Sequence, residues 1–151
     1  MRVALEQLRT AGSLMFSTWE LLLVAEVELE IGEHLRAQAT IEEAFENINR
    51  TRDYWCEAEL YRVAAEILLG TPGRSVSEAE AYLRRAIEIA GRQQAKWWEL
   101  RATKSLARLL CETNRHDEAR AMLAAVYQWF TEGFDTADLK DAKALLDELS
   151  A

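Results

Sequence analysis

Apolar and polar residues alternate with a helical period through residues 94–149. A first amphipathic stretch places apolar and small residues on one face, at Trp98, Ala102, Leu106, Ala107, Leu109 and Leu110. A second stretch begins at Asp117 and does the same with Ala119, Leu123, Val126, Tyr127 and Phe130. Gly133 is the expected left-handed stop of that second helix. Because only Asn-Arg-His separates the two stretches, residues 94–133 are predicted to form an antiparallel helical hairpin.

The same alternation divides the whole chain into helices. The predicted elements are a leading helix (residues 1–12), three hairpins (residues 13–50, 51–91 and 94–133) and a C-terminal helix (residues 135–150). The leading helix looks like the second helix of a hairpin whose first helix is missing, which suggests that the chain is the end of something longer. In the middle hairpin, Ser77 and Glu80 have the spacing of a capping box, so its second helix is predicted to start there.

The order of small and large residues in these hairpins is typical of tetratricopeptide repeats. The clearest copy is in the first hairpin, at Leu21, Val24, Ala25, Gly32, Ala37, Ile41 and Ala44. The equivalent alanines Ala37, Ala79 and Ala119 are 42 and 40 residues apart. The period is therefore about 40 residues, longer than the roughly 34 of the standard repeat. Tetratricopeptide-like hairpins with longer helices are the expectation, and ordinary helix pairs or other helical-repeat classes are the alternatives.

Hairpins of this kind stack side by side, because each buries its apolar face against its neighbours. The sequence therefore predicts one all-α domain of about eight helices, stacked as a right-handed α-solenoid. In such an array the first helices of the hairpins line a concave wall. The C-terminal helix keeps a polar outer face and is expected to cover the last hairpin.

Composition and charge narrow the class of function. The chain has 151 residues, half of them apolar, with a single proline and a net charge of −8. Neither nucleic acid nor an anionic membrane is an expected partner of so acidic a chain. No apolar run approaches the roughly 20 residues that span a bilayer, and no secretory signal precedes the first helix. Cys56 and Cys111 stand far apart, so reduced thiols in a cytoplasmic protein are expected and a disulfide is the alternative.

Three stretches carry a resemblance to a known family: AELYR at residues 58–62, AKWWELRA at residues 95–102 and WFTEGFDTADLK at residues 129–140. With their flanking segments they resemble the C-terminal tetratricopeptide region of large bacterial signalling proteins. Those proteins join a class III adenylate/guanylate cyclase domain, or a DNA-binding domain, to an AAA-type ATPase and then to helical repeats. The resemblance implies a regulatory or partner-binding role, with the cyclase and ATPase activities in parts that lie outside this sequence.

The residues themselves carry no catalytic pattern. The chain holds no phosphate-binding loop of the Gly-x-x-x-x-Gly-Lys-Ser/Thr form, and its serines, cysteines and histidines have no spacing typical of a nucleophile. Glu30, Glu33 and His34 resemble part of a metal site, but such sites need matching ligands from other helices, and no second Glu-x-x-His follows. We therefore expect no catalytic, cofactor or metal site, and a non-catalytic protein.

Binding is the predicted function, on the concave wall of the first helices. Residues expected to face a partner there are Trp19, Leu22, Glu26, Ala58, Tyr61, Arg62, Ala65, Trp98, Arg101, Lys104 and Arg108. Arg101, Lys104 and Arg108 follow helical spacing and share one face, which suits an acidic peptide. The partner is thus predicted to be a protein or an acidic peptide, other domains of the same parent protein included. A solvated outer stripe is the alternative interpretation of these three residues.

The uneven distribution of charge along the chain also suggests that its charged patches make contacts. Residues 26–46 carry a net charge of −6, and residues 74–108 a net charge of +4. These patches either steer a partner, or pair two copies as a homodimer, or are intramolecular neighbours. Trp97 and Trp98 are adjacent, so a helix cannot bury both equally and one is expected at an interface or a hairpin junction. A further alternative is a small-ligand sensor with a pocket around Tyr61, Arg62 and Arg101.

Overall fold

The computed structural model describes residues 17–73 and 75–150, and every regular element in these ranges is an α-helix. In chain order they are α2 (Ser17–Glu30), α3 (His34–Thr51), α4 (Glu57–Gly70), α5 (Val76–Gln93), α6 (Lys96–Glu112), α7 (His116–Tyr127) and α8 (Ala137–Glu148). The predicted all-α class is confirmed for this part of the chain. The predicted leading helix, residues 1–12, lies outside the described residues.

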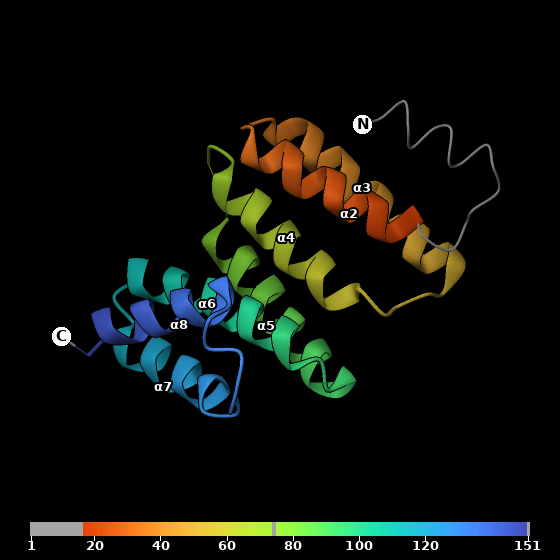
Figure 1. The fold of residues 1–151 in the computed structure, drawn as a ribbon. Coiled ribbons are helices and arrows are strands. Elements are labelled where there is room, and N and C mark those ends of the chain that lie inside the picture. The colour runs from red at the N-terminus through yellow and green to blue at the C-terminus, as the bar shows by residue number, and fades with distance from the viewer. Residues whose placement is uncertain (1–16, 74, 151) are drawn as a thin grey trace.

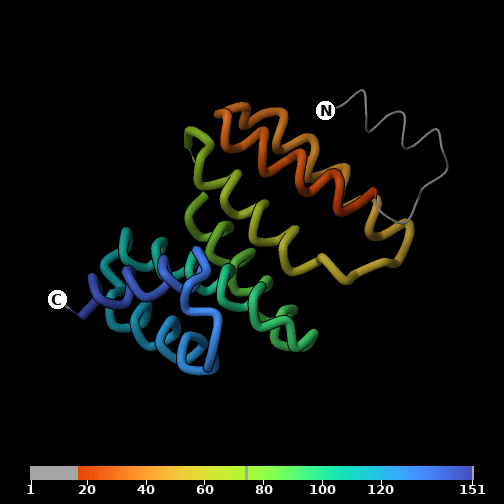
Figure 2. Tube along the Cα trace, in the orientation of Figure 1, coloured from red at the N-terminus to blue at the C-terminus, as the bar shows by residue number. Residues whose placement is uncertain are grey.

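Each helix packs against the next one along the chain, from the α2–α3 pair to the α7–α8 pair (Figure 1). In addition, α2 contacts α4, α4 contacts α6 and α6 contacts α8, and we call these four helices the first-helix layer. Figure 2 shows the chain passing from the α2–α3 pair at one end, through α4 and α5, to α6, α7 and α8 at the other end. The backbones of helices three apart in the chain, such as α2 and α5, do not approach one another among the described residues.

Alanine occupies the positions where the helices approach one another most closely. The alanines that are almost completely buried are Ala25, Ala37, Ala44, Ala58, Ala64, Ala65, Ala79, Ala86, Ala90, Ala102, Ala107, Ala119 and Ala142. Between them lie fully buried leucines and isoleucines, such as Leu60, Leu83 and Leu106. The small side chains bring the helix backbones close, and the large ones fill the remaining space at the density of a protein interior. This alternation of small and large buried side chains is what produces the repeat pattern in the sequence.

The start of α5 differs from the prediction. The N-cap is Ser75, whose hydroxyl accepts a hydrogen bond from the backbone N–H of Glu78 at 3.3 Å. The predicted capping box of Ser77 and Glu80 is therefore wrong by two residues. Glu80 does not reach back to the helix start, because its carboxylate accepts hydrogen bonds from Arg84 and Arg115 instead. One of these partners, Arg84, lies one turn along α5, and the other, Arg115, belongs to the next hairpin.

The end of the third hairpin also differs from the prediction. Helix α7 ends at Tyr127, and the N–H groups of Trp129 and Phe130 turn back to the carbonyls of Val126 and Tyr127 at 3.3 and 3.1 Å. Phe130 is buried as expected, but from the turn after the helix, where its ring packs on Trp97. Gly133 has the left-handed conformation predicted for it, with a φ of +78°, in the same connecting segment.

Enlarging a buried alanine tests the close-packing account. Ala107 is 1% exposed inside the core formed by α4 to α8, whereas Ala144 on α8 is exposed. Ala107→Leu is expected to lower the free energy of unfolding by about 1–3 kcal/mol, because the added carbons force neighbouring helices apart. Ala144→Leu makes the same chemical change on a solvated face and is expected to change stability by less than about 0.5 kcal/mol. Urea denaturation of both variants measures the difference, and equal effects would contradict close packing at Ala107.

Candidate binding surfaces

The basic residues predicted to grip a partner are engaged within the chain itself. Arg101 donates hydrogen bonds to the carboxylates of Glu59 at 2.9 Å and Glu26 at 3.4 Å. Lys104 is 7% exposed, and its Nζ lies 2.7 Å from Asp138 Oδ1. Only Arg108, the third member of the predicted stripe, is exposed and forms no ion pair within the described residues. The stripe therefore does not present three free cations to an acidic peptide.

Arg62 lies at the centre of the charged residues on α4. Its side chain is only 6% exposed and contacts three carboxylates, those of Glu26, Glu59 and Glu66. Burial acts to lower the pKa of Arg62, but the carboxylates of Glu66 and Glu59 outweigh it and raise that pKa further. The guanidinium stays charged, and removing its partners would leave a buried charge uncompensated. Arg62 is thus a structural residue, not one that faces a partner.

Glu59 is the most deeply buried carboxylate of this group, with 1% of its side chain exposed. Its Oε2 accepts hydrogen bonds from both Arg62 and Arg101, and its Oε1 has no hydrogen-bond partner. Burial raises the pKa of Glu59 above its ordinary value, and the neighbouring Arg62 and Arg101 act in the opposite direction. Both arginines hold the same oxygen, so Glu59 ties α4 to α6.

Together these contacts form a chain of ion pairs across the first-helix layer, which we call the ion-pair ladder. Glu26–Arg62 joins α2 to α4, Glu59–Arg101 joins α4 to α6, and Lys104–Asp138 joins α6 to α8. The ladder comprises Glu26, Glu59, Arg62, Glu66, Arg101, Lys104, Asp138 and Asp141. It holds five carboxylates and three basic groups, so its exposed edge is acidic. The sequence allowed three interpretations of the charge pattern. The Arg101–Glu26 contact supports the one in which the acidic and basic patches are neighbours within the same chain.

The remaining residues predicted for this wall do not share one face. Leu22 is 1% exposed and belongs to the core, and Ala58 and Ala65 are equally buried. Tyr61 packs on Phe45 of α3 and Tyr82 of α5, with ring centroids 5.1 and 5.6 Å apart. It therefore points to a different side of α4 from Arg62, toward α3 and α5. Among the described pockets, none is lined by Tyr61, Arg62 and Arg101 together.

The tryptophans gather near the starts of the first helices. Trp55 bridges Trp19 and Trp98, with ring centroids 5.2 and 5.8 Å apart. Trp97 and Trp98 are not buried equally, since Trp97 is 43% exposed and Trp98 half-buried. Trp97 instead contacts Phe130 in the segment before α8. These rings form an aromatic edge that runs along the first-helix layer.

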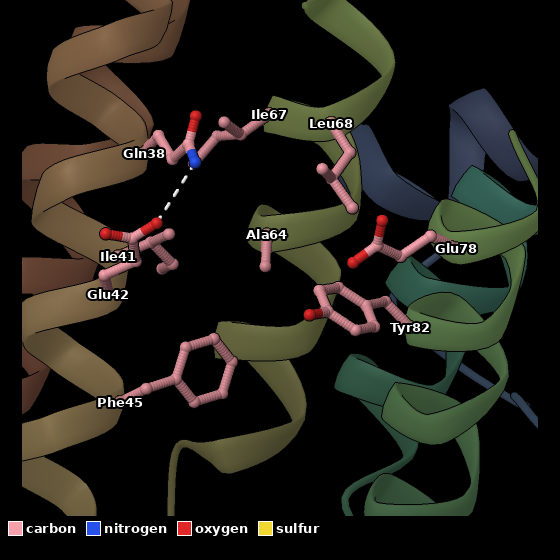
Figure 3. A pocket seen from close by; sticks show the side chains of 9 residues that line it. All are labelled: Gln38, Ile41, Glu42, Phe45, Ala64, Ile67, Leu68, Glu78 and Tyr82. Atoms are coloured by element: carbon pink, nitrogen blue, oxygen red, sulfur yellow. Dashed lines mark hydrogen bonds between the residues drawn. The ribbon is translucent and has the colours of Figure 1, made fainter. Parts of the chain in front are cut away.

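An apolar groove lies on the other side of the layer, between α3 and α5 (Figure 3). Its floor is α4, where Ala64, Ile67 and Leu68 line it, and its volume is about 160 Å³. Phe45 of α3 and Tyr82 of α5 stand on opposite walls, as Figure 3 shows. Ala64 leaves this space open because it carries a single carbon at a position where larger side chains would fill the hollow.

Polar groups line the rim of the groove. Glu42 accepts a hydrogen bond from Gln38 at 3.1 Å on the α3 wall, and Glu78 lies beside Tyr82 on the α5 wall (Figure 3). Burial and the nearby Glu78 carboxylate raise the pKa of Tyr82, so its hydroxyl remains protonated at neutral pH. The groove therefore offers an apolar floor between two carboxylates. The sequence did not predict this groove, because its walls come from different helices and no single helix pattern marks the space between them.

A second group of charges joins α5 to α7. The Arg84 guanidinium lies 2.7 Å from both Glu80 and Glu118, and Arg115 pairs with the same two carboxylates. Hydrogen bonds from Arg84 lower the pKa of both Glu80 and Glu118, and Arg115 lowers it further. These surface contacts link the second and third hairpins on the side away from the ion-pair ladder.

The described residues contain no arrangement suited to metal binding or to nucleophilic attack by a thiol. No three His, Cys, Asp or Glu side chains are grouped to hold a metal ion, and the His34 ring lies against Gly70 of α4. Both cysteines are free, and burial raises the pKa of the Cys56 thiol to about 11. A thiol with so high a pKa is protonated near neutral pH and is a poor nucleophile. Across the same residues no helix is both long and apolar enough to cross a membrane.

Comparison of the chain with protein-family models, with curated proteins and with solved structures found no match. The family resemblance of the sequence therefore remains a proposal. The function proposed below is argued from the surfaces described above.

The charges between α5 and α7 predict how stability depends on pH. Because the pKa values of Glu80 and Glu118 are lower in the folded chain than in the unfolded one, their contribution is present above the unfolded pKa and is lost as pH falls through the folded pKa. Replacing both with Gln is expected to reduce the fall in melting temperature between about pH 6 and about pH 3. Glu30→Gln/Glu148→Gln changes two exposed carboxylates that form no ion pair within the described residues, and this control is expected to leave that fall unaltered. An identical acid slope in all three proteins, followed by circular dichroism, would contradict the assignment.

Proposed function

We propose that the chain is a non-catalytic protein-interaction and regulatory module built as a tetratricopeptide-like α-solenoid. The packing order supports the solenoid, since each helix contacts the next and the first helices contact one another in sequence. The buried alanines at tetratricopeptide spacing support the repeat class. By its resemblance, the chain is the C-terminal repeat region of a cytoplasmic bacterial signalling protein that also carries cyclase and ATPase domains.

The groove between α3 and α5 is the observation that carries this proposal. It lies between two helix pairs and is lined by the half-buried Phe45 and Leu68 together with the buried Ile41 and Ile67. A cavity of about 150 Å³ holds a ring the size of benzene, so this groove of about 160 Å³ accepts one large apolar side chain. A protein segment is a suitable occupant, because helix-lined apolar grooves typically receive an apolar anchor from a partner.

The rim of the groove specifies the charge of that segment. Glu42 and Glu78 are exposed carboxylates on opposite walls, and none of the described residues that line the groove is basic. We therefore propose a partner segment that places one large apolar side chain between Phe45 and Tyr82 and basic side chains beside the two carboxylates. This differs from the acidic peptide expected on the first-helix layer, where the ion-pair ladder already neutralises Arg101 and Lys104.

Selection from a displayed library of random short peptides tests this proposal. Selected peptides are expected to share a large apolar residue flanked by Arg or Lys. Their affinity is expected to fall at least about tenfold for Glu42→Lys/Glu78→Lys, because the carboxylates that attract them become cations. The control is Glu30→Lys/Glu148→Lys, which changes the net charge equally at exposed positions away from the groove and is expected to bind normally.

Two results would contradict the proposal. One is that no peptide binds this chain better than it binds an unrelated helical protein. The other is that acidic peptides are selected and lose affinity in Arg101→Glu/Arg108→Glu while binding the groove variant normally. That second result would favour the first-helix layer as the binding surface.

A further inference from the structure

The aromatic edge contains two hollows that share Trp97 and Trp129. One, of about 390 Å³, is lined by Gln94, Ala95, Lys96, Trp97, Trp98 and Trp129. The other, of about 570 Å³, is lined by Trp97, Trp129, Phe130, Thr131, Glu132 and Gly133. Trp129 is 58% exposed and Trp97 43% exposed, although they belong to the largest apolar side chains of the protein. Two indole rings this exposed at one place are a typical feature of a recognition surface.

The first hollow already contains a cation. The Lys96 ammonium lies 5.9 Å from the centroid of the Trp129 ring, within the range of a cation–π interaction. The same ammonium is 2.6 Å from the Glu99 carboxylate, so this cation has both an aromatic and an anionic contact. The chain itself thus places a basic side chain against Trp129.

The second hollow has the corresponding groups but no cation among the described residues. Its walls are Trp97, Trp129 and Phe130, and Glu132 is its carboxylate. Glu132 is exposed and forms no ion pair within the described residues. The segment from Gln128 to Thr136 that forms this hollow contains Glu132 and Asp135 and no basic residue.

The backbone keeps the Trp97 wall accessible. Gly133 adopts a φ of +78°, and a Cβ built on it would lie 3.5 Å from the Trp97 ring. The absence of a side chain there leaves the indole uncovered toward the hollow. The local turn therefore presents an aromatic surface and a carboxylate together.

We propose that this second hollow binds an arginine side chain of a partner protein. A planar guanidinium stacks on indole rings, and its fork of N–H donors matches a carboxylate such as that of Glu132. The volume of about 570 Å³ leaves room for the long aliphatic part of the side chain beside Phe130. This site is separate from the groove between α3 and α5, and it does not rest on the function proposed for that groove.

Nuclear magnetic resonance of the five indole N–H groups tests this site directly. The probe is a short capped glycine peptide with one central arginine, and the matched peptide carries citrulline, its neutral analogue. The arginine peptide is expected to shift the Trp97 and Trp129 signals saturably and to leave Trp19 unchanged. Glu132→Gln is expected to weaken binding about five- to tenfold, through loss of the charge-assisted hydrogen bond, and Trp129→Ala to abolish the Trp97 shift.

Glu30→Gln is the control variant, because it removes an exposed carboxylate that lines neither hollow, and it is expected to bind the arginine peptide as the original chain does. The proposal is overturned if the citrulline peptide gives the same shifts, since no guanidinium charge would then be recognised. It is also overturned if Glu132→Gln binds the arginine peptide with unchanged affinity. Either result would leave the proposed function of the α3–α5 groove intact.

Discussion

The buried contact between Arg62 and its carboxylates constrains the arrangement of all the first helices. A guanidinium that is 6% exposed must keep its partners, since an uncompensated buried charge costs several kcal/mol. Those partners come from α2 as well as α4, and Glu59 extends the network to Arg101 of α6. The helices of the layer are therefore held in one register by charge as well as by packing.

Because the charges of the first-helix layer pair with one another, the candidate binding surfaces lie elsewhere on the chain. A basic stripe that is free in solution attracts acidic partners, but Arg101 and Lys104 are occupied by Glu59 and Asp138. An acidic peptide would have to displace partners that are already desolvated and well placed. The hollow beside Trp129 combines exposed indole rings with the Glu132 carboxylate. The groove beside Ala64 combines an apolar lining with the carboxylates of Glu42 and Glu78, so both surfaces suit a basic partner better than an acidic one.

The sequence predicted the parts of the structure that depend on local periodicity. The alanine spacing at Ala37, Ala79 and Ala119 identified core positions, and all three are fully buried. The features that the sequence did not predict depend on contacts between residues far apart in the chain. Glu80, predicted to cap α5, instead binds Arg115, 35 residues away. Tyr61 and Arg62 were both predicted to face the concave wall, yet consecutive helical residues point in directions about 100° apart.

The same limit applies to the candidate sites. Periodicity marks Phe130 as inward, but the turn that carries it and the hollow beside it follow from where α7 ends. Likewise, the groove exists because α3 and α5 stand apart over Ala64, which no single helix pattern encodes. Apolar faces were predictable from each helix alone, whereas surfaces formed by two helices were not.

A double-mutant cycle on Glu59 and Arg101 tests most directly whether the charges of the first-helix layer bind one another. The free energy of unfolding would be measured in urea for Glu59→Gln, Arg101→Gln and the double variant. The account predicts a coupling energy of about 1 kcal/mol or more, because each single change leaves a partly buried partner unpaired. Effects that add to within about 0.3 kcal/mol would show that Glu59 and Arg101 do not stabilise one another. Arg101 would then be available to bind a partner.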